Sequence, residues 1–104
     1  MKLYHYSHTK IETIDMTKCD GFWMTTIAPT ETELLEEIGA DGLSFCHVVE
    51  FDDAGECLMN SDNHCVEELL KENECDYILN RYEGFDDYAT TNPDLVKIIE
   101  CIEM

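Results

Sequence analysis

The chain has 104 residues, which leaves room for a single domain spanning residues 1–104. Hydrophobic residues make up 44% of the sequence, a globular composition that excludes a disordered chain despite the many charges. The formal net charge of −18 excludes direct binding to nucleic acid or to an anionic membrane, because both are polyanions. Such a charge would attract a basic protein surface, or it would serve solubility alone.

The six cysteines suggest reduced thiols. The N-terminal segment Met1–His5 lacks an apolar signal sequence, and no two cysteines form a CxxC pair. We therefore expect free, mostly buried thiols and a cytoplasmic location. A zinc site at Cys57, His64 and Cys65 fits no standard spacing, so we expect no metal.

Two short strands and a helix are expected first along the chain. Leu3–Ser7 is rich in aromatic residues, and Gly21–Thr26 follows an Asp-Gly turn signal, so both are predicted strands. A helix is predicted after Pro29, with Thr30 and Glu33 as a capping box and Gly39 as its end. Its apolar face would hold three residues, Leu34, Leu35 and Ile38.

The middle of the chain predicts a long strand, a hairpin and a second helix. Leu43–Phe51 alternates as a strand does, and Glu56–Met59 is expected to return as its hairpin partner. Ser61–Asn63 would cap a helix whose apolar stripe is Cys65, Val66, Leu69 and Leu70.

The C-terminal third is expected to close the sheet. Asp76–Leu79 fits either a helix or a strand. After Asp87–Thr91 and a corner at Pro93, the apolar run Leu95–Ile102 predicts a strand buried on much of both faces. Two helices among five or six short strands place the chain in the α+β class.

Three of these segments resemble motifs of the ADP-ribosyltransferases of the diphtheria-toxin and poly-ADP-ribose-polymerase type. Leu3–Ser7 is similar to the first core strand of that family, L-[YF]-H-G-[ST], and Gly21–Thr26 is similar to its Gly-x-Tyr-Phe-x-[ST] strand. Asp87–Ile99 resembles the closing hairpin of many small bacterial and phage members. The segments occur in the family's order and span the chain. The resemblance implies a small ADP-ribosyltransferase-like fold, a mostly antiparallel split sheet with two short helices, and NAD as cofactor.

The resemblance also implies roles for single residues. Cleavage of the nicotinamide–ribose bond of NAD passes through an oxocarbenium-like state, which a positioned carboxylate stabilises. Asp87, or alternatively Asp86, would supply that carboxylate, and His5 would bind the ribose. Trp23, or alternatively Phe22, would stack on the nicotinamide ring. The implied catalytic residues are Asp87 and His5, and the implied cofactor-binding residues are His5, Tyr6, Phe22, Trp23 and Thr25.

The sequence departs from the family pattern at three of these positions. Tyr6 replaces a glycine, Trp23 replaces a tyrosine, and Asp87 replaces a glutamate that is one methylene longer. A catalytic version and a degenerate, non-catalytic version therefore both fit the residues. Structural alternatives also remain open: His5 bonded to a neighbouring carbonyl, Trp23 in the core, and Asp86 with Asp87 in a turn.

Two functions follow as expectations. The first is an ADP-ribosyltransferase-like protein that uses NAD to modify a partner macromolecule, by analogy a phage- or mobile-element-encoded inhibitor of host defence. The alternative is a non-catalytic acidic nucleic-acid mimic that blocks the basic surface of a nucleic-acid-binding protein. The alternative depends on nine acids without a base in residues 31–60 and on the carboxylates of two predicted helices. These helix carboxylates are Glu31, Glu33, Glu36, Glu37, Glu67, Glu68 and Glu72.

Overall fold

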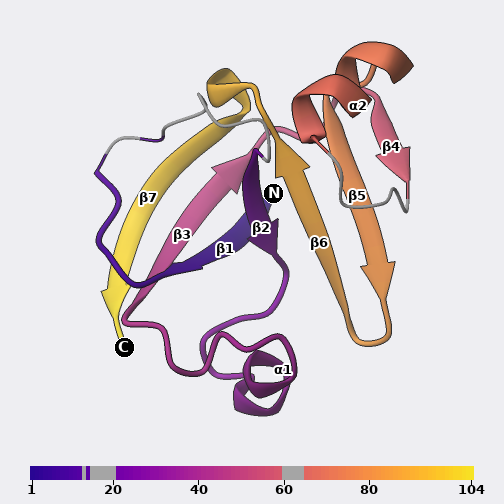
Figure 1. Cartoon of the computed structure of the whole chain (residues 1–104). Coiled ribbons are helices and arrows are strands. Elements are labelled where there is room, and N and C mark those ends of the chain that lie inside the picture. Colours follow the sequence, from indigo (N-terminus) through magenta and orange to yellow (C-terminus); the bar gives the residue numbers. More distant parts are fainter. Residues whose placement is uncertain (13, 15–20, 60–64) are drawn as a thin grey trace.

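A mixed sheet of seven strands organises the chain, with two helices at its margins (Figure 1). The computed structural model describes residues 1–12, 14, 21–59 and 65–104. In chain order the elements are β1 (Lys2–Ser7), β2 (Phe22–Thr25), α1 (Thr32–Glu37), β3 (Phe45–Phe51), β4 (Cys57–Met59), α2 (Val66–Asn73), β5 (Tyr77–Tyr82), β6 (Phe85–Thr90), the 3-10 helix η1 (Pro93–Leu95) and β7 (Val96–Glu103). The α+β class, the two short helices and the mostly antiparallel pairing are confirmed.

The strand order is β4-β5-β6-β2-β1-β3-β7, so the N-terminal strand β1 lies near the middle of the sheet. β1 pairs with β3 along its whole length, but it pairs with β2 only where Tyr4 lies opposite Thr25. In Figure 1 the strands on the two sides of this junction spread apart toward α1. The sheet is therefore two halves joined at a narrow contact between β1 and β2.

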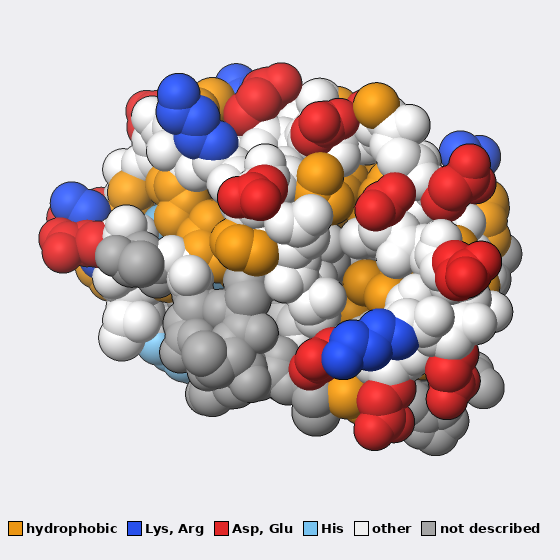
Figure 2. All heavy atoms as spheres, turned by 90° about the horizontal axis from the view of Figure 1, so that it is seen from above, with side chains coloured by type: hydrophobic (Ala, Val, Ile, Leu, Met, Phe, Trp, Pro, Cys, Tyr) orange, Lys and Arg blue, Asp and Glu red, His pale blue; other side chains and the backbone are white. Residues whose placement is uncertain are grey.

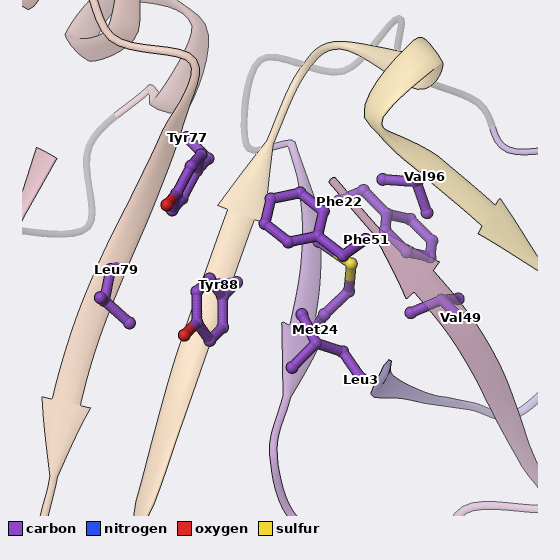
Figure 3. Close-up of a cluster of buried hydrophobic side chains, with 9 residues drawn as sticks. All are labelled: Leu3, Phe22, Met24, Val49, Phe51, Tyr77, Leu79, Tyr88 and Val96. Carbon is purple, nitrogen blue, oxygen red and sulfur yellow. The ribbon is translucent and has the colours of Figure 1, made fainter. Parts of the chain in front are cut away.

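One face of the sheet carries the main core (Figure 3). Leu3 of β1, Met24 of β2 and Phe51 of β3 are at most 2% exposed and pack with aromatic rings from β5 and β6. Because side chains alternate along a strand, this packing also determines which residues of β2 face the opposite side. Trp23 and Thr25 therefore point away from the core of Figure 3.

Each helix covers a smaller apolar cluster. Leu35 of α1 is buried with Ile27 and Ala40, and Val66 and Leu70 of α2 pack on strand residues of β5 and β6. Burial of one side chain of this size contributes roughly 1.5–3 kcal/mol, so a helix of six or eight residues depends on such contacts.

The two ends of α1 differ in how well the sequence predicts them. Gly39 ends the helix as predicted, with a positive φ of 74° that suits glycine. The predicted capping box of Thr30 and Glu33 is wrong. The N-cap residue is Glu31, whose Oε2 accepts a hydrogen bond from the backbone N–H of Ala28 at 2.6 Å. The predicted cap of α2 at residues 61–63 lies outside the described residues.

Three predictions about pairing and burial are wrong. β4 is not the hairpin partner of β3; it lies at the far edge and pairs in parallel with β5. β7 is the other edge strand, and only Val96 in it is buried, while Ile99 is 52% exposed. β6 and β7 do not form a closing hairpin, because β2, β1 and β3 lie between them. The ambiguous segment Asp76–Leu79 leads into strand β5.

The cysteines form no disulfide within the described residues. The five described cysteines, Cys46, Cys57, Cys65, Cys75 and Cys101, are free thiols. Cys19 lies outside the described residues. So does His64, one of the three residues of the zinc site that the sequence analysis considered and did not expect. Within the described ranges, no helix is long and apolar enough to cross a membrane. Figure 2 shows one face on which carboxylates are more frequent than cationic side chains.

The entrance to β2 generates a stability prediction. Gly21 has φ +74°, and an added Cβ would lie 3.1 Å from the Thr90 carbonyl oxygen and 3.2 Å from Val66 Cγ1. We expect Gly21→Ala to lower the free energy of unfolding by at least about 1–2 kcal/mol, measured by urea denaturation. Gly42→Ala is the matched control, because a Cβ there has no neighbour within 4 Å. Equal losses in both variants would contradict this account.

Candidate active site

The sheet forms a small hollow at the junction between β1 and β2, with a volume of ≈ 170 Å³. It lies between the two halves of the sheet, and Ile38 at the end of α1 borders it. Its lining residues are Tyr4, His5, Tyr6, Trp23, Met24, Thr25, Ile38 and Asp87. Residues from the first, second and sixth strands therefore meet at one place.

His5 links β1 to β2 through its ring. Its Nδ1 lies 2.5 Å from the carbonyl oxygen of Trp23, so Nδ1 carries the hydrogen and donates it. Its ring stacks on Phe22 with centroids 4.2 Å apart, which places the imidazole against the core side of the sheet. Burial lowers the pKa of His5, while the bond to Trp23 opposes this shift and the nearby His47 adds to it. His5 is therefore a neutral ring at pH 7 whose Nε2 is a hydrogen-bond acceptor.

His47 holds the backbone of His5 in place. It is fully buried on β3, directly opposite His5. Its Nε2 accepts a hydrogen bond from the backbone N–H of Ile11 at 2.8 Å, so its Nδ1 carries the hydrogen and donates to the carbonyl oxygen of His5 at 3.2 Å. Both ring nitrogens are satisfied, and His47 is a structural residue that fixes the position of β1 beside the hollow.

Two aromatic side chains line the hollow. Trp23 is half-buried and also packs against the apolar cluster under α2. The alternative prediction that Trp23 belongs to the core is therefore partly correct. The Tyr6 hydroxyl donates a hydrogen bond to the carbonyl oxygen of Ile27 at 2.6 Å, which orients its ring toward the cluster beside α1. Burial raises the pKa of Tyr6, so its hydroxyl stays protonated. Trp23 therefore provides the larger aromatic surface at the site.

Asp87 supplies the carboxyl group of the hollow. It lies in β6 directly opposite Thr25 of β2, and its Oδ1 is buried without a hydrogen-bond partner among the described residues. Burial raises the pKa of Asp87, the Thr25 hydroxyl opposes this shift, and the neighbouring charge of Asp86 adds to it. A carboxylate oxygen that is buried without a donor is costly, and such an atom requires an explanation.

A second unpartnered oxygen lies next to Asp87. Asn80 of β5 lies directly opposite Asp87 and is 5% exposed, and its Oδ1 is also buried without a partner among the described residues. Cross-strand pairing produces a polar row across four strands that runs Asn80, Asp87, Thr25, Tyr4. Two adjacent acceptors without a donor require a hydrogen between them or a ligand that supplies one.

The structure brings together most of the residues that the sequence suggested. Tyr6, Trp23, Thr25 and Asp87 line the hollow. His5 also borders it, but its ring stacks on Phe22 at the core face and so points away from the side chains of Trp23 and Asp87. The remaining suggested residues do not line it. Phe22 is buried in the core and supports the His5 ring from that side, and Asp86 contributes its carbonyl oxygen to a bond from the Thr25 hydroxyl. Asp86 and Asp87 belong to a strand and not to a turn.

Sequence reasoning missed several residues around the hollow. The sequence indicated no role at the site for Tyr4 or Ile38, and none for Asn80 or His47. A signal for Asn80 did exist, because it directly follows the apolar run Tyr77–Leu79. Once the segment is known to be a strand, a buried side-chain amide in that strand suggests that a specific hydrogen-bond partner lies nearby.

The chemistry of the hollow favours a flat, positively charged ring. None of its lining residues is lysine or arginine, and it combines an indole with a carboxyl group. An indole face and a carboxylate both attract a cation. No group of three or more possible metal ligands occurs in the ranges that the structure describes. No protein-family model, curated protein or solved structure matches this chain.

The cost of the Asp87 carboxylate can be measured. Folding raises the pKa of Asp87, so ionisation of Asp87 lowers the free energy of unfolding at a pH above its pKa in the folded protein. This loss of stability disappears when the pH falls below the pKa of Asp87 in the unfolded chain. We expect Asp87→Asn to raise the free energy of unfolding at pH 7 by about 1 kcal/mol, because an amide N–H can also donate to Asn80. Urea denaturation at pH 7 measures this difference.

Asp86→Asn is the matched control for this experiment. It removes the same formal charge from the neighbouring residue but leaves the buried Oδ1 of Asp87 in place. A gain in stability that is as large in Asp86→Asn would show that overall charge repulsion, and not the buried carboxylate, is responsible.

Proposed function

We propose that this chain is an ADP-ribosyltransferase-like protein that binds the nicotinamide end of NAD in the hollow and transfers ADP-ribose to a partner macromolecule. One observation carries this proposal: Trp23 and Asp87, distant in the sequence, line a single hollow, while the His5 ring lies on the opposite face of the sheet against Phe22. The family resemblance gave Trp23 the stacking role and Asp87 the charge-stabilising role; the direction of the His5 ring does not support the ribose-binding role that the resemblance gave to His5. The proposal that the fold is ADP-ribosyltransferase-like rests on the same observation.

The contents of the hollow suit the proposed reaction. The nicotinamide ring of NAD carries a positive charge, and the ribose carbon becomes cationic as the bond to nicotinamide breaks. An ionised Asp87 would stabilise that charge, and the Trp23 face would stack on the ring. These groups belong to strands, so their positions are set before a ligand arrives.

The size of the hollow limits how much of the cofactor it encloses. Pockets for ligands of drug size measure roughly 300–1,000 Å³, and this hollow measures ≈ 170 Å³. It would therefore enclose the nicotinamide ring, while the diphosphate and adenosine would lie over the surface. Lys2 and Lys10 are exposed on the N-terminal segment and are the described cations closest in sequence to His5.

Binding of NAD can be followed through the single tryptophan of the chain, Trp23. We expect NAD to quench the fluorescence of Trp23 with a saturable dependence on concentration, because the nicotinamide ring would stack on the indole. Isothermal calorimetry should give the same dissociation constant, and Asp87→Ala should weaken binding by tenfold or more, which corresponds to about 1.4 kcal/mol. Asp86→Ala is the control and should bind at least as tightly as the wild type, because the charge of Asp86 disfavours the ionised form of Asp87. The proposal fails if neither method detects saturation.

Transfer itself is tested with labelled NAD and a cell lysate. We expect incorporation of label or release of nicotinamide by the wild type and a loss of at least about 100-fold in Asp87→Ala, because electrostatic stabilisation of the transition state would be gone. The rate should rise with pH through a midpoint above that of an ordinary aspartate, since burial raises the pKa of Asp87 and only its ionised form can act. A rate that is equal in Asp87→Ala would exclude this role.

The second candidate function is a non-catalytic nucleic-acid mimic that blocks a basic protein surface. Its support is the exposure of Glu33, Glu36 and Glu37 on α1, which contains no basic residue. The two helices lie at different ends of the sheet in Figure 1, so their carboxylates do not form one continuous stripe. In the lysate experiment this function would appear as capture of a basic protein by Asp87→Ala as well as by the wild type.

A further inference from the structure

The unpartnered oxygens of Asn80 and Asp87 carry an inference beyond the binding of NAD. The two residues lie directly opposite each other on β5 and β6, with their side chains on the same face of the sheet. Cβ atoms of such a pair are about 4.5–5.5 Å apart, which is within reach of a hydrogen bond between short side chains. Both Oδ1 atoms are buried and lack a partner among the described residues.

The surroundings offer little that could satisfy either oxygen. Thr25 is the neighbour on β2, and its hydroxyl lies 3.3 Å from the carbonyl oxygen of Asp86 and also interacts with the carboxyl group of Asp87, but Oδ1 of Asp87 remains without a partner among the described residues. Tyr4 on β1 lies one strand further, and Ile38 on the α1 side is apolar. The charge of Asp86, the adjacent residue in β6, disfavours an ionised Asp87. A hydrogen located between the two oxygens would satisfy both of them.

We propose that Asn80 is a positioning residue for Asp87: in the ligand-free chain the protonated carboxyl group of Asp87 donates a hydrogen bond from its Oδ1 to Oδ1 of Asn80. The pairing itself requires no cofactor. Its role in catalysis rests on the proposed function. When Asp87 ionises, the proton leaves to solvent and the carboxylate becomes free to face a cation in the hollow. Asn80 thus determines both the orientation of the carboxyl group and the pH at which it becomes charged.

The test is a pH titration of the full chain by nuclear magnetic resonance, without NAD. We expect the side-chain carboxyl carbon of Asp87 to titrate at a midpoint above that of an ordinary aspartate. We also expect the side-chain carbonyl and amide resonances of Asn80 to shift with the same midpoint, because the amide loses its donor when Asp87 ionises. This readout needs no substitution, so it does not depend on whether a variant folds.

Asn80→Ala provides the second arm of the test. Removing the acceptor destabilises the protonated carboxyl group, so the midpoint of Asp87 should fall. Asn73→Ala is the matched control, because Asn73 is an exposed residue of α2 whose amide donates to the carbonyl oxygen of Leu69 at 2.8 Å. This control should leave the midpoint unchanged.

Three outcomes would overturn the proposal: an ordinary midpoint for Asp87, Asn80 resonances that do not follow it, or a midpoint that rises in Asn80→Ala. The last outcome would mean that the amide nitrogen donates to an ionised Asp87. Because no NAD is present, the pairing can be confirmed even if the protein never binds NAD. Conversely, NAD could bind to a protein in which the pairing is absent.

Discussion

The hydrogen bond between the His5 ring and the Trp23 carbonyl oxygen is the interaction on which the rest of the structure depends. β1 and β2 share one residue pair, so the ladder between them contributes little to holding the halves of the sheet together. The imidazole adds a bond from side chain to backbone at that point, and Phe22 packs against the ring. The two halves can then spread apart beside the junction without separating, and the hollow lies at that opening. A full ladder between β1 and β2 would leave no such space.

The electrostatics of the hollow carry a cost that the fold does not require. In a chain with a net charge of −18, one more buried carboxyl group adds to the repulsion that opposes folding. An apolar residue at position 87 would remove that cost, since Ala89, two residues along on the same face of β6, is fully buried against its neighbours. Asn80 adds to the cost by placing another buried oxygen beside the first. Departures of this kind from ordinary packing are expected where a site has a function; here Asp87 lines the hollow and Asn80 lies directly opposite it on β5.

The sequence predicts the local elements better than their pairing. Leu3–Ser7 and the end of α1 at Gly39 could be recognised because strand propensity and glycine conformation are local properties. The pairing of β4 with β5 could not be predicted, because a strand of three residues carries too little sequence pattern to identify its neighbour in the sheet. The apolar run of β7 does not distinguish an edge strand from a central one, since both can be rich in isoleucine. For the site, the motif residues His5, Trp23 and Asp87 were accessible from the sequence, but Asn80 required the register of β5 against β6.

The acidity of the chain has opposite consequences for its two candidate functions. A basic protein surface is attracted by the net charge of −18, so its association weakens as salt screens that field. The diphosphate of NAD is repelled by the same field, and screening therefore favours its approach. Only the cationic nicotinamide ring is attracted, and that attraction acts at short range, between Trp23 and Asp87 inside the hollow. Salt should therefore strengthen an interaction directed by the hollow and weaken one directed by the surface. The sign of that dependence separates a protein that uses its hollow from one that uses only its charge.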